Sequence, residues 1–359
     1  MSRIKLHTKW FSLIAAAGLL LSWPILGSAA DSTFYKGKTI EMIVAYEAGS
    51  SQDLEARLIA NHWGKQLPGN PQFRIRNMPG AGGLRAVRYV YKNVTPDGLT
   101  VGFFGVSSPV EQLMAPYRKE KGILDFDVTR LAWIGSTGGN SYLFSVHRNS
   151  GIKNLKDLLA SKETIKAGAT RPGSTTFTGP ALIREIFKAP IDIITGYSGG
   201  ADRDLAFFRE EVHAVYSSWP SYVARNQDWL KQGLVVPIMM MGDRIPEEDL
   251  MRWFKTKDIP HILELVKKKE DIQLVRLATY PGSWGRLIGV PPGTPADRLD
   301  ALRKAFAALA KDKALLAENE RRKTQVYPMA WDVVGNMIKD YLDVSPDTVR
   351  RFLKVIEES

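Results

Sequence analysis

The sequence predicts an α/β protein with two domains, each a mostly parallel sheet flanked by helices. From Thr39 onward, short runs rich in Ile and Val alternate with segments of helical periodicity, which is the pattern of βαβ units. The chain has 359 residues, enough for two domains of ordinary size. With 44% hydrophobic and 24% charged residues, its composition is that of a globular protein.

The alternation defines the elements in order. The first strand is predicted at Thr39–Tyr46, and a helix follows at 53–67, where apolar residues recur every three or four positions. Further strands are predicted at Phe73–Asn77, Leu99–Gly105, Leu131–Gly135, Ser141–His147, Ile165–Ala169, Ile191–Thr195 and Val235–Met240. Further helices are predicted at Gly83–Lys92, from Asn154 and from Thr175.

Residues 1–30 have the layout of a secretory signal peptide. Basic residues at Arg3, Lys5 and Lys9 precede an apolar run at 10–26, and small residues follow at 27–30. A run of about 17 residues that contains a proline is short for a membrane span of roughly 20. We therefore expect cleavage after Ala30, export, and a periplasmic mature chain that begins at Asp31.

Several classes of chemistry find no support. The chain has no cysteine, and its histidines lack metal-ligand spacing, so we expect no metal site and no cofactor. No nucleophile elbow or phosphate loop occurs, and Arg85 replaces the third glycine of a dinucleotide fingerprint that would begin at Gly80. The sequence therefore predicts no catalytic residue and no enzyme.

Charged segments have an ordinary explanation. The net charge is +11, but the basic residues are dispersed, so we expect no nucleic-acid partner. The carboxylates of Asp202–Glu211 fit the solvated face of a helix. Its apolar face would carry Leu205, Phe207 and Phe208.

The loops after successive strands share Gly, Ser and Thr. Such loops turn backbone N–H groups and hydroxyls toward one cleft and can hold an anion without a metal. The alternative, that turns require these residues anyway, stays open. The loops are Glu47–Gln52, Gly105–Pro109, Ser136–Ser141, Thr170–Thr176 and Ser217–Ser221.

A series of motifs runs through the chain, beginning with Tyr35–Asp53, Asn77–Gly83 (NMPGAGG) and Pro96-Asp97-Gly98. It continues through Ile152–Leu159, Gly196–Ala206, Pro220-Ser221 and Ser283–Pro295. The series resembles the substrate-binding proteins of tripartite tricarboxylate transporters, the TctC or Bug receptors, over essentially the whole mature chain. The resemblance implies a two-domain, type II periplasmic-binding fold that closes over a small carboxylate. It also implies delivery to a permease with one large and one small integral membrane subunit.

The resemblance also assigns candidate binding residues. The family's first anion loop falls on Ala48, Gly49, Ser50 and Ser51, with Asp53 as its acidic residue. The cradle of the second domain falls on Thr170–Thr176, and the loop across the cleft falls on Ser217 and Ser218. This chain departs from the family at Glu47, which would repel a carboxylate unless it points away, and at Ser50.

The expected ligand is a small organic anion, a mono- or dicarboxylate. Neutral donors of Gly49–Ser51, Ser107, Ser108 and the cradle residues Arg171, Gly173, Ser174 and Thr175 would hold it. Arg171 and Arg286 could each pair with a second carboxylate, or instead form salt bridges within the protein. The aromatic residues Tyr46, Trp219 and Trp284 would leave room for an aromatic or longer aliphatic acid, although Trp284 could instead pack at the hinge.

The domains are expected to be discontinuous. Residues 31–130 and 282–359 would form the first domain and 131–281 the second, with a first crossing at Leu131–Gly135 and a second between Val235–Met240 and Ser283. The expected protein is a monomeric binding protein for a transporter. The alternatives are a sensor that acts on a membrane histidine kinase and, less compatible with the missing nucleophile, a secreted hydrolase.

Overall fold

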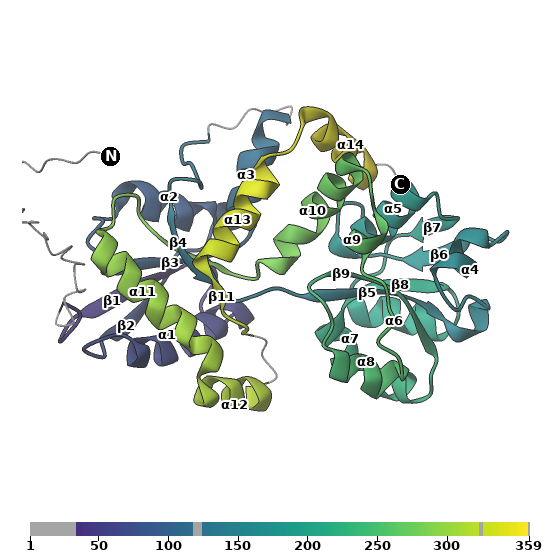
Figure 1. Ribbon diagram of the computed structural model, residues 1–359, viewed down its shortest axis with the longest axis horizontal. Helices are drawn as coiled ribbons and strands as arrows, with labels where there is room; N and C mark the ends of the chain where they lie inside the picture. Colours follow the sequence, from purple (N-terminus) through teal and green to yellow (C-terminus); the bar gives the residue numbers. More distant parts are fainter. Residues whose placement is uncertain (1–33, 118–123, 323–325, 358–359) are drawn as a thin grey trace, which may run out of the picture.

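The structure is a computed structural model that describes residues 34–117, 124–322 and 326–357. Two β-sheets flanked by helices form two lobes side by side (Figure 1). The predicted signal peptide, residues 1–30, lies outside the described residues. Within the three described ranges, no helix is long and apolar enough to cross a membrane.

The first sheet has six strands in the order β11-β4-β10-β3-β1-β2. At its centre β1 pairs in parallel with β2 and β3, and Met42 lies opposite Ile75 and Val101. Ile40 and Met42–Val44 are fully buried, because helices cover both faces of this sheet. The strands are β1 Thr39–Val44, β2 Gln72–Asn77, β3 Thr100–Phe104, β4 Ala132–Ser136, β10 Leu287–Val290 and β11 Met329–Ala330.

The second sheet has five strands in the order β7-β6-β8-β5-β9. Here β6 pairs in parallel with β7 and β8, whereas β5 is antiparallel to β8 and β9. The strands are β5 Ser141–His147, β6 Ile165–Gly168, β7 Ile191–Ile194, β8 Ala214–Ser218 and β9 Val235–Gly242. The predicted bounds of β5 are confirmed, and those of the other predicted strands are within one or two residues.

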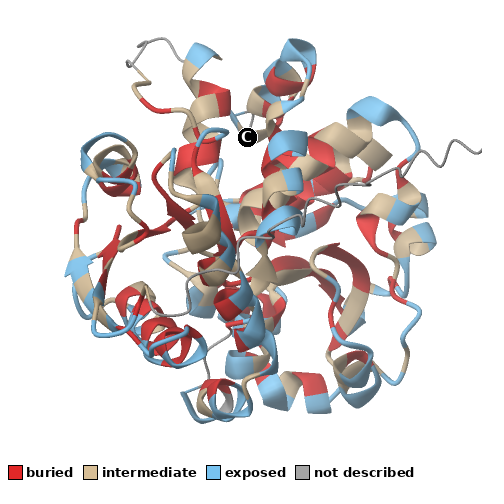
Figure 2. Ribbon diagram, turned by 60° about the vertical axis from the view of Figure 1, so that its left-hand side comes forward, coloured by how far each residue is buried: buried red, intermediate tan, exposed pale blue. Residues whose placement is uncertain are grey.

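Helices cover the faces of both sheets. Around the first sheet lie α1 Ser51–Gln66, α2 Leu84–Asn93, α3 Ser107–Met114, α11 Ala296–Ala308, α12 Lys313–Arg322 and α13 Trp331–Leu342. Around the second lie α4 Leu155–Ala160, α5 Thr175–Phe187, α6 Gly200–Phe208, α7 Trp219–Lys231, α8 Glu247–Phe254 and α9 Ile262–Leu265. The buried residues follow the strands and the inner faces of these helices (Figure 2).

Two further helices lie between the lobes. Helix α10 (Lys269–Ser283) packs on α14 (Pro346–Glu357), and α14 also contacts α5 of the second lobe. Val349 and Phe352 share a buried cluster with Leu182 of α5. The C-terminal helix, predicted to be part of the first domain, therefore packs against helices of the second.

Both sheets are mixed: the predicted parallel pairing holds for β1 with β2 and β3 and for β6 with β7 and β8, and the remaining pairs are antiparallel. The short edge strand β11 is antiparallel to β4, and in each sheet one inner strand runs against the main direction: β10 between β3 and β4, and β5 between β8 and β9. These are the strands by which the chain enters a sheet after crossing from the other lobe. The parallel strands end toward the other lobe, so a strand that arrives from there has to run the opposite way.

The two crossings lie side by side. The first is Thr137–Asn140, because β4 pairs within the six-stranded sheet, so the predicted position at Leu131–Gly135 is wrong. The second is Gly282–Arg286, at the end of the predicted interval. The Thr137 N–H donates to the Arg286 carbonyl at 2.9 Å, and the Asn140 N–H donates to the Gly282 carbonyl at 3.1 Å.

Glycine allows this close approach. A Cβ at Gly139 would overlap Ser283 Cα, and a Cβ at Gly285 would overlap the Gly138 carbonyl. Gly285 also has a φ of 63°, which a side chain would strain. The backbones of the two crossings are therefore in direct contact, with no side chain between them.

We expect Gly139→Ala to lower the free energy of unfolding by about 1–3 kcal/mol or more, because the new methyl group has no space. Urea denaturation measures the change. The matched control is Gly335→Ala in α13, where a Cβ meets nothing within 4 Å and alanine favours the helix. Equal stability of the two variants would contradict the close packing of the crossings.

Candidate functional site

The loop between β1 and α1 is held by its own side chains. Ser50 is the N-cap of α1, and its hydroxyl accepts from the Asp53 N–H at 3.2 Å and donates to the Glu47 carbonyl at 2.8 Å. The N–H groups of Ser51 and Gln52, in the first turn of α1, have no intrahelical acceptor. Ala48, Gly49 and the side chain of Glu47 are exposed. The loop therefore presents backbone donors at the positive end of a 16-residue helix.

Asp53 supports this loop from beneath. Its side chain is buried and accepts from the Gly49 N–H at 2.8 Å, from Asn77 Nδ2 at 2.8 Å and from Arg57 Nε at 3.0 Å. Burial by itself would raise the pKa of the Asp53 carboxyl, but these hydrogen bonds outweigh it and hold the pKa below its ordinary value. The carboxylate therefore positions Gly49 and has no free face for an anionic ligand.

The start of α3 contributes two serines. Ser107 donates to the Gly82 carbonyl at 2.7 Å, which joins this helix to the glycine-rich segment before α2. The hydroxyl of Ser108 is fully buried and has no hydrogen-bond partner among the described residues. Ser108 therefore sits beneath the helix start and exposes no donor.

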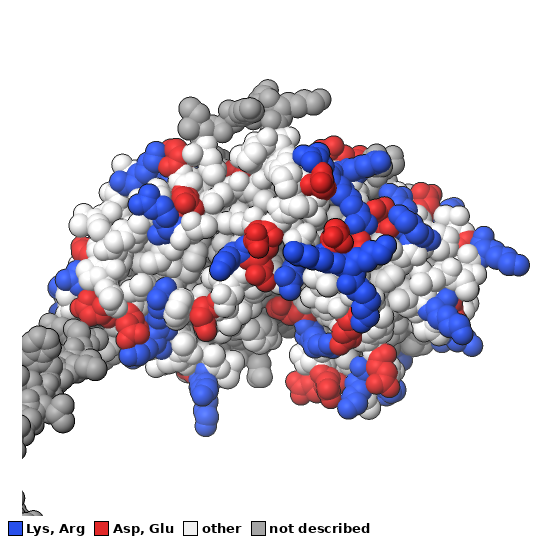
Figure 3. Space-filling model, turned by 45° about the horizontal axis from the view of Figure 1, so that its top comes forward, with Lys and Arg blue, Asp and Glu red and all other residues white. Residues whose placement is uncertain are grey.

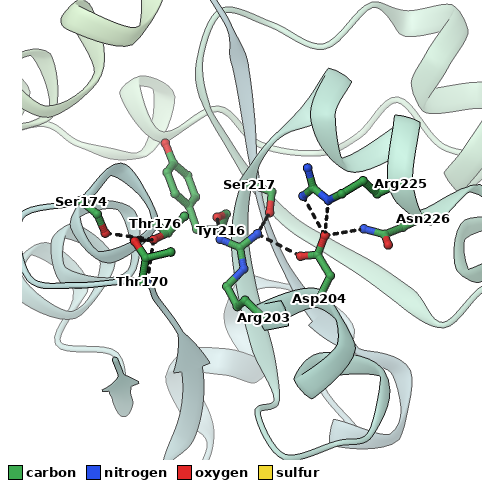
Figure 4. A network of polar contacts seen from close by, with 9 residues as sticks. All are labelled: Thr170, Ser174, Thr176, Arg203, Asp204, Tyr216, Ser217, Arg225 and Asn226. Carbon is green, nitrogen blue, oxygen red and sulfur yellow. Dashed lines mark hydrogen bonds and ion pairs between the residues drawn. The ribbon is translucent and has the colours of Figure 1, made fainter. Parts of the chain in front are cut away.

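The loop between β6 and α5 is closed by its own hydroxyls (Figure 4). Ser174 caps α5 and donates to the Arg171 carbonyl at 2.7 Å, and Thr176 Oγ1 lies 3.2 Å from Thr170 Oγ1. Gly173 and Thr175 are exposed, as is Arg171, which forms no ion pair with an acidic residue in the described ranges. The outward groups of this loop are therefore Arg171, Thr175 and the N–H groups that start α5.

Ser217 and Ser218 end β8, and a buried ionic network lies behind them (Figure 4). Arg203 donates to Ser217 Oγ, to the Tyr216 carbonyl at 3.0 Å and to Asp204 at 3.0 Å. Asp204 also accepts from Arg225 and Asn226 at 2.7–2.9 Å. Ser218 donates to Asn140 of the first crossing at 3.3 Å.

This network corrects the prediction for Asp202–Glu211. Arg203 and Asp204 are each 1% exposed, whereas Leu205 and Phe208 are 41% and 43% exposed. Of the predicted apolar face, Phe207 alone is buried. The adjacent opposite charges of Arg203 and Asp204 were the signal that these side chains could be buried as a pair.

Arg286 lies beside the second crossing. Its Nε is 3.9 Å from Glu55 Oε2, and its guanidinium lies over the Tyr46 ring at 5.4 Å. Burial raises the pKa of Glu55, and the opposing effects of Arg286 and a hydrogen bond with Thr137 are smaller. This ion pair matches the alternative stated for Arg286, and its role toward a ligand stays a prediction.

The two predicted tryptophans pack inside the protein. Trp219 is 2% exposed and donates to Asp249 at 3.1 Å, and Trp284 is fully buried with its ring centre 5.0 Å from that of Tyr341. Of the three predicted aromatic residues, Tyr46 alone is half-exposed near the crossings.

Two adjoining cavities bring part of the site together. A cavity of about 60 Å³ and a groove of about 660 Å³ share Thr175, Thr178, Ala278 and Pro281 as lining residues. The groove also reaches Val110 of α3, so it joins helices that start at candidate loops of both lobes. Gly49–Ser51 and Ser217–Ser218 line neither of these two cavities.

Among the described residues, the charged side chains around the site indicate neither a metal site nor a patch of one charge. Within residues 34–117, 124–322 and 326–357, no three His, Asp or Glu side chains are grouped to hold a metal. On the face drawn in Figure 3, acidic and basic side chains are interspersed. The arrangement offers helix starts, hydroxyls and one exposed arginine, which suit an anion held by hydrogen bonds.

Comparisons with known proteins agree with this geometry. The chain is 29% identical over 351 residues to a Cupriavidus necator protein named "UPF0065 protein in gbd 5'region", covering 96% of this chain and 94% of that protein. A solved TctC solute-binding protein from Polaromonas superimposes with a TM-score of 0.68 at 19% identity, covering 90% and 100% of the two chains. The fold is that of a solute-binding protein. No family model matches the chain.

A second structure extends the comparison. An R. palustris protein solved with adipate superimposes on this solute-binding fold with a TM-score of 0.50 at 19% identity. The match covers 89% of this chain and 97% of that chain. The predicted two-domain α/β class is thereby confirmed, apart from the strand directions.

We expect Asp53→Asn to lower the free energy of unfolding by about 1–3 kcal/mol at neutral pH, because one carboxylate oxygen becomes an NH2 group that cannot accept, so at least one of the three donors loses its acceptor and the negative charge is lost. The folded pKa is depressed, so the carboxylate stabilises fully above its unfolded pKa of about 3.9, and this stabilisation is lost as pH falls through the folded value. Denaturation at several pH values should show the difference between parent and variant shrinking below about pH 4.

Asp300→Asn is the control, since Asp300 makes an exposed ion pair with Lys304 that contributes less than about 0.5 kcal/mol. If the Asp53 variant matches this control at every pH, Asp53 does not hold the loop.

Proposed function

We propose that this chain is an extracytoplasmic solute-binding protein that captures a small organic carboxylate and delivers it to a tripartite tricarboxylate-type secondary transporter. The observation that carries the proposal is the arrangement of helix starts. α1, α3 and α5 begin after strands that run toward the crossings, and their loops carry Gly, Ser and Thr. Backbone donors on both sides of the crossings suit an anion that bridges two domains.

The remaining parts of the proposal rest on the same arrangement and on the resemblance to the receptors of tripartite tricarboxylate transporters. The two sheets are the cores of two domains, and closure about the paired crossings excludes water from the ligand. The site binds without turnover, because it offers hydrogen-bond donors and no nucleophile beside a base. The protein acts as a periplasmic monomer, and its partners are the large and small integral membrane subunits. The TctC fold and the neighbour solved with adipate support a carboxylate ligand.

A thermal-shift screen against small carboxylates tests the binding function. A ligand at 100 times its Kd adds about 2.7 kcal/mol to the native state. For domains of about 150–250 residues each kcal/mol moves Tm by roughly 2–4 °C. Shifts with neutral or cationic solutes in place of carboxylates would contradict the proposal, and recovery of chemically altered ligand would indicate an enzyme.

We expect Ser51→Pro to weaken carboxylate binding roughly 10-fold or more while the protein stays folded. Proline removes one donor, but the first position of a helix tolerates it, and Ser50 already has the extended conformation that precedes proline (φ −67°, ψ 161°). Isothermal titration calorimetry gives the change in Kd.

Lys313→Pro is the matched control, because it makes the same replacement at the first position of the remote α12 after the extended Asp312. Its Kd should equal that of the parent. A Ser51→Pro variant that binds carboxylates as tightly as this control excludes the α1 loop from the site.

The proposed export has its own test. N-terminal sequencing of the mature protein from the periplasmic fraction should begin at Asp31 or within a residue or two, since cleavage is expected after Ala30. A soluble cytoplasmic protein that retains Met1 would overturn this location.

A further inference from the structure

The two cavities at the start of α5 differ in polarity. Half of the residues that line the smaller cavity, about 60 Å³, carry hydroxyls: Tyr142, Thr175, Thr178, Thr279 and Tyr216. The adjoining groove, about 660 Å³, is lined mainly by apolar side chains, among them Val110, Met114, Leu277, Phe352, Leu353 and Ile356. A polar end therefore opens into an apolar groove between α3, α10 and α14.

Tyr216 is a buried, hydroxyl-bearing residue of this site. Tyr216 is 3% exposed, and its ring stacks on that of Tyr142 with the ring centres 5.3 Å apart. The ring also covers Gly179 so closely that a Cβ there would overlap it. The Tyr216 phenol is thus held in one orientation between β5 and α5.

The hydroxyl of Tyr216 makes no hydrogen bond to a residue of the described chain. Its backbone carbonyl accepts from Arg203, and the phenol points away from that guanidinium (Figure 4). Tyr216 lines the small cavity, and a donor held in one orientation at a cavity wall suits an acceptor on a ligand.

We propose that the cavity and the groove together bind an amphiphilic monocarboxylate, with its carboxylate at the hydroxyls of Tyr216 and Thr175 and its apolar chain or ring along α10 and α14. This inference rests on the proposed carboxylate capture and specifies the class of substrate. Thr175 belongs to the predicted cradle and also lines the two cavities. A carboxylate bound at Thr175 can therefore contact the cradle while the rest of the ligand lies in the groove.

The electrostatics agree with a neutral donor. Burial raises the pKa of the Tyr216 hydroxyl well above its ordinary value, and burial also raises that of Tyr142. Tyr216 therefore keeps its proton at any physiological pH and can donate to a carboxylate. Glu357 is the charged residue that lines the groove. A second carboxylate on the ligand would therefore lie against apolar side chains and near another negative charge, which disfavours a dicarboxylate.

Titration calorimetry with acetate, butanoate, hexanoate, octanoate and adipate tests the inference on the full mature protein. We expect about a fourfold gain in affinity per added methylene until the groove is filled, and tighter binding of hexanoate than of adipate. In Ala278→Phe, a larger side chain lies in the groove, and the gain per methylene should disappear.

Tyr216→Phe removes the hydroxyl and keeps the ring, and it should weaken hexanoate and octanoate binding 10-fold or more. The control is Tyr222→Phe, since Tyr222 is equally buried but packs with Trp219 and Leu230 in a different cluster. Its affinities should match the parent, and thermal unfolding checks that both variants are folded.

The outcomes separate the two proposals. If carboxylates bind but affinity is independent of chain length, or Tyr216→Phe binds as the parent does, this inference is wrong and carboxylate capture stands. Preference for adipate over hexanoate also overturns it. If no carboxylate binds, the proposed function fails and this inference fails with it.

Discussion

The close packing of the two crossings is the constraint on which the rest of the structure depends. Thr137–Asn140 and Gly282–Arg286 touch backbone to backbone, because glycines leave no side chain between them. Asp243 adds to this contact by accepting from Ser283 and from the Gly139 N–H. Each crossing delivers a strand that must run away from the other lobe, which makes both sheets mixed.

The same constraint gathers the candidate loops. Because β1, β3, β6 and β8 all end toward the crossings, the helix starts that follow them lie at the facing edges of the two sheets. The donors there are mostly neutral, and the cation nearest the crossings, Arg286, is already close to Glu55. An anion at such a site is held by directed hydrogen bonds, which select by shape and by number of acceptors more than by net charge.

Local sequence features predicted the local structure well. β5 was located to the residue, and the helices predicted from Asn154 and from Thr175 begin at Leu155 and Thr175. The reversed direction of β5 and β10 was not predicted and the first crossing was placed wrongly, because both depend on pairing between segments far apart in the chain, such as β4 with β10 about 150 residues later. The composition of the loops predicted candidate binding segments, but not that Asp53 and Ser108 face inward.

The buried Arg203–Asp204 pair shows why polarity misleads in a single sequence. Every oxygen of Asp204 accepts a hydrogen bond, and two of the three guanidinium nitrogens of Arg203 donate, so burial no longer leaves an isolated charge. Replacing such a pair with apolar residues often costs little, so its contribution is better sought in geometry than in stability. Arg203 joins Ser217 and the Tyr216 carbonyl to α6, and thereby fixes the end of β8 beside the first crossing. The network thus sets the backbone from which the Tyr216 phenol extends into the cavity at the start of α5.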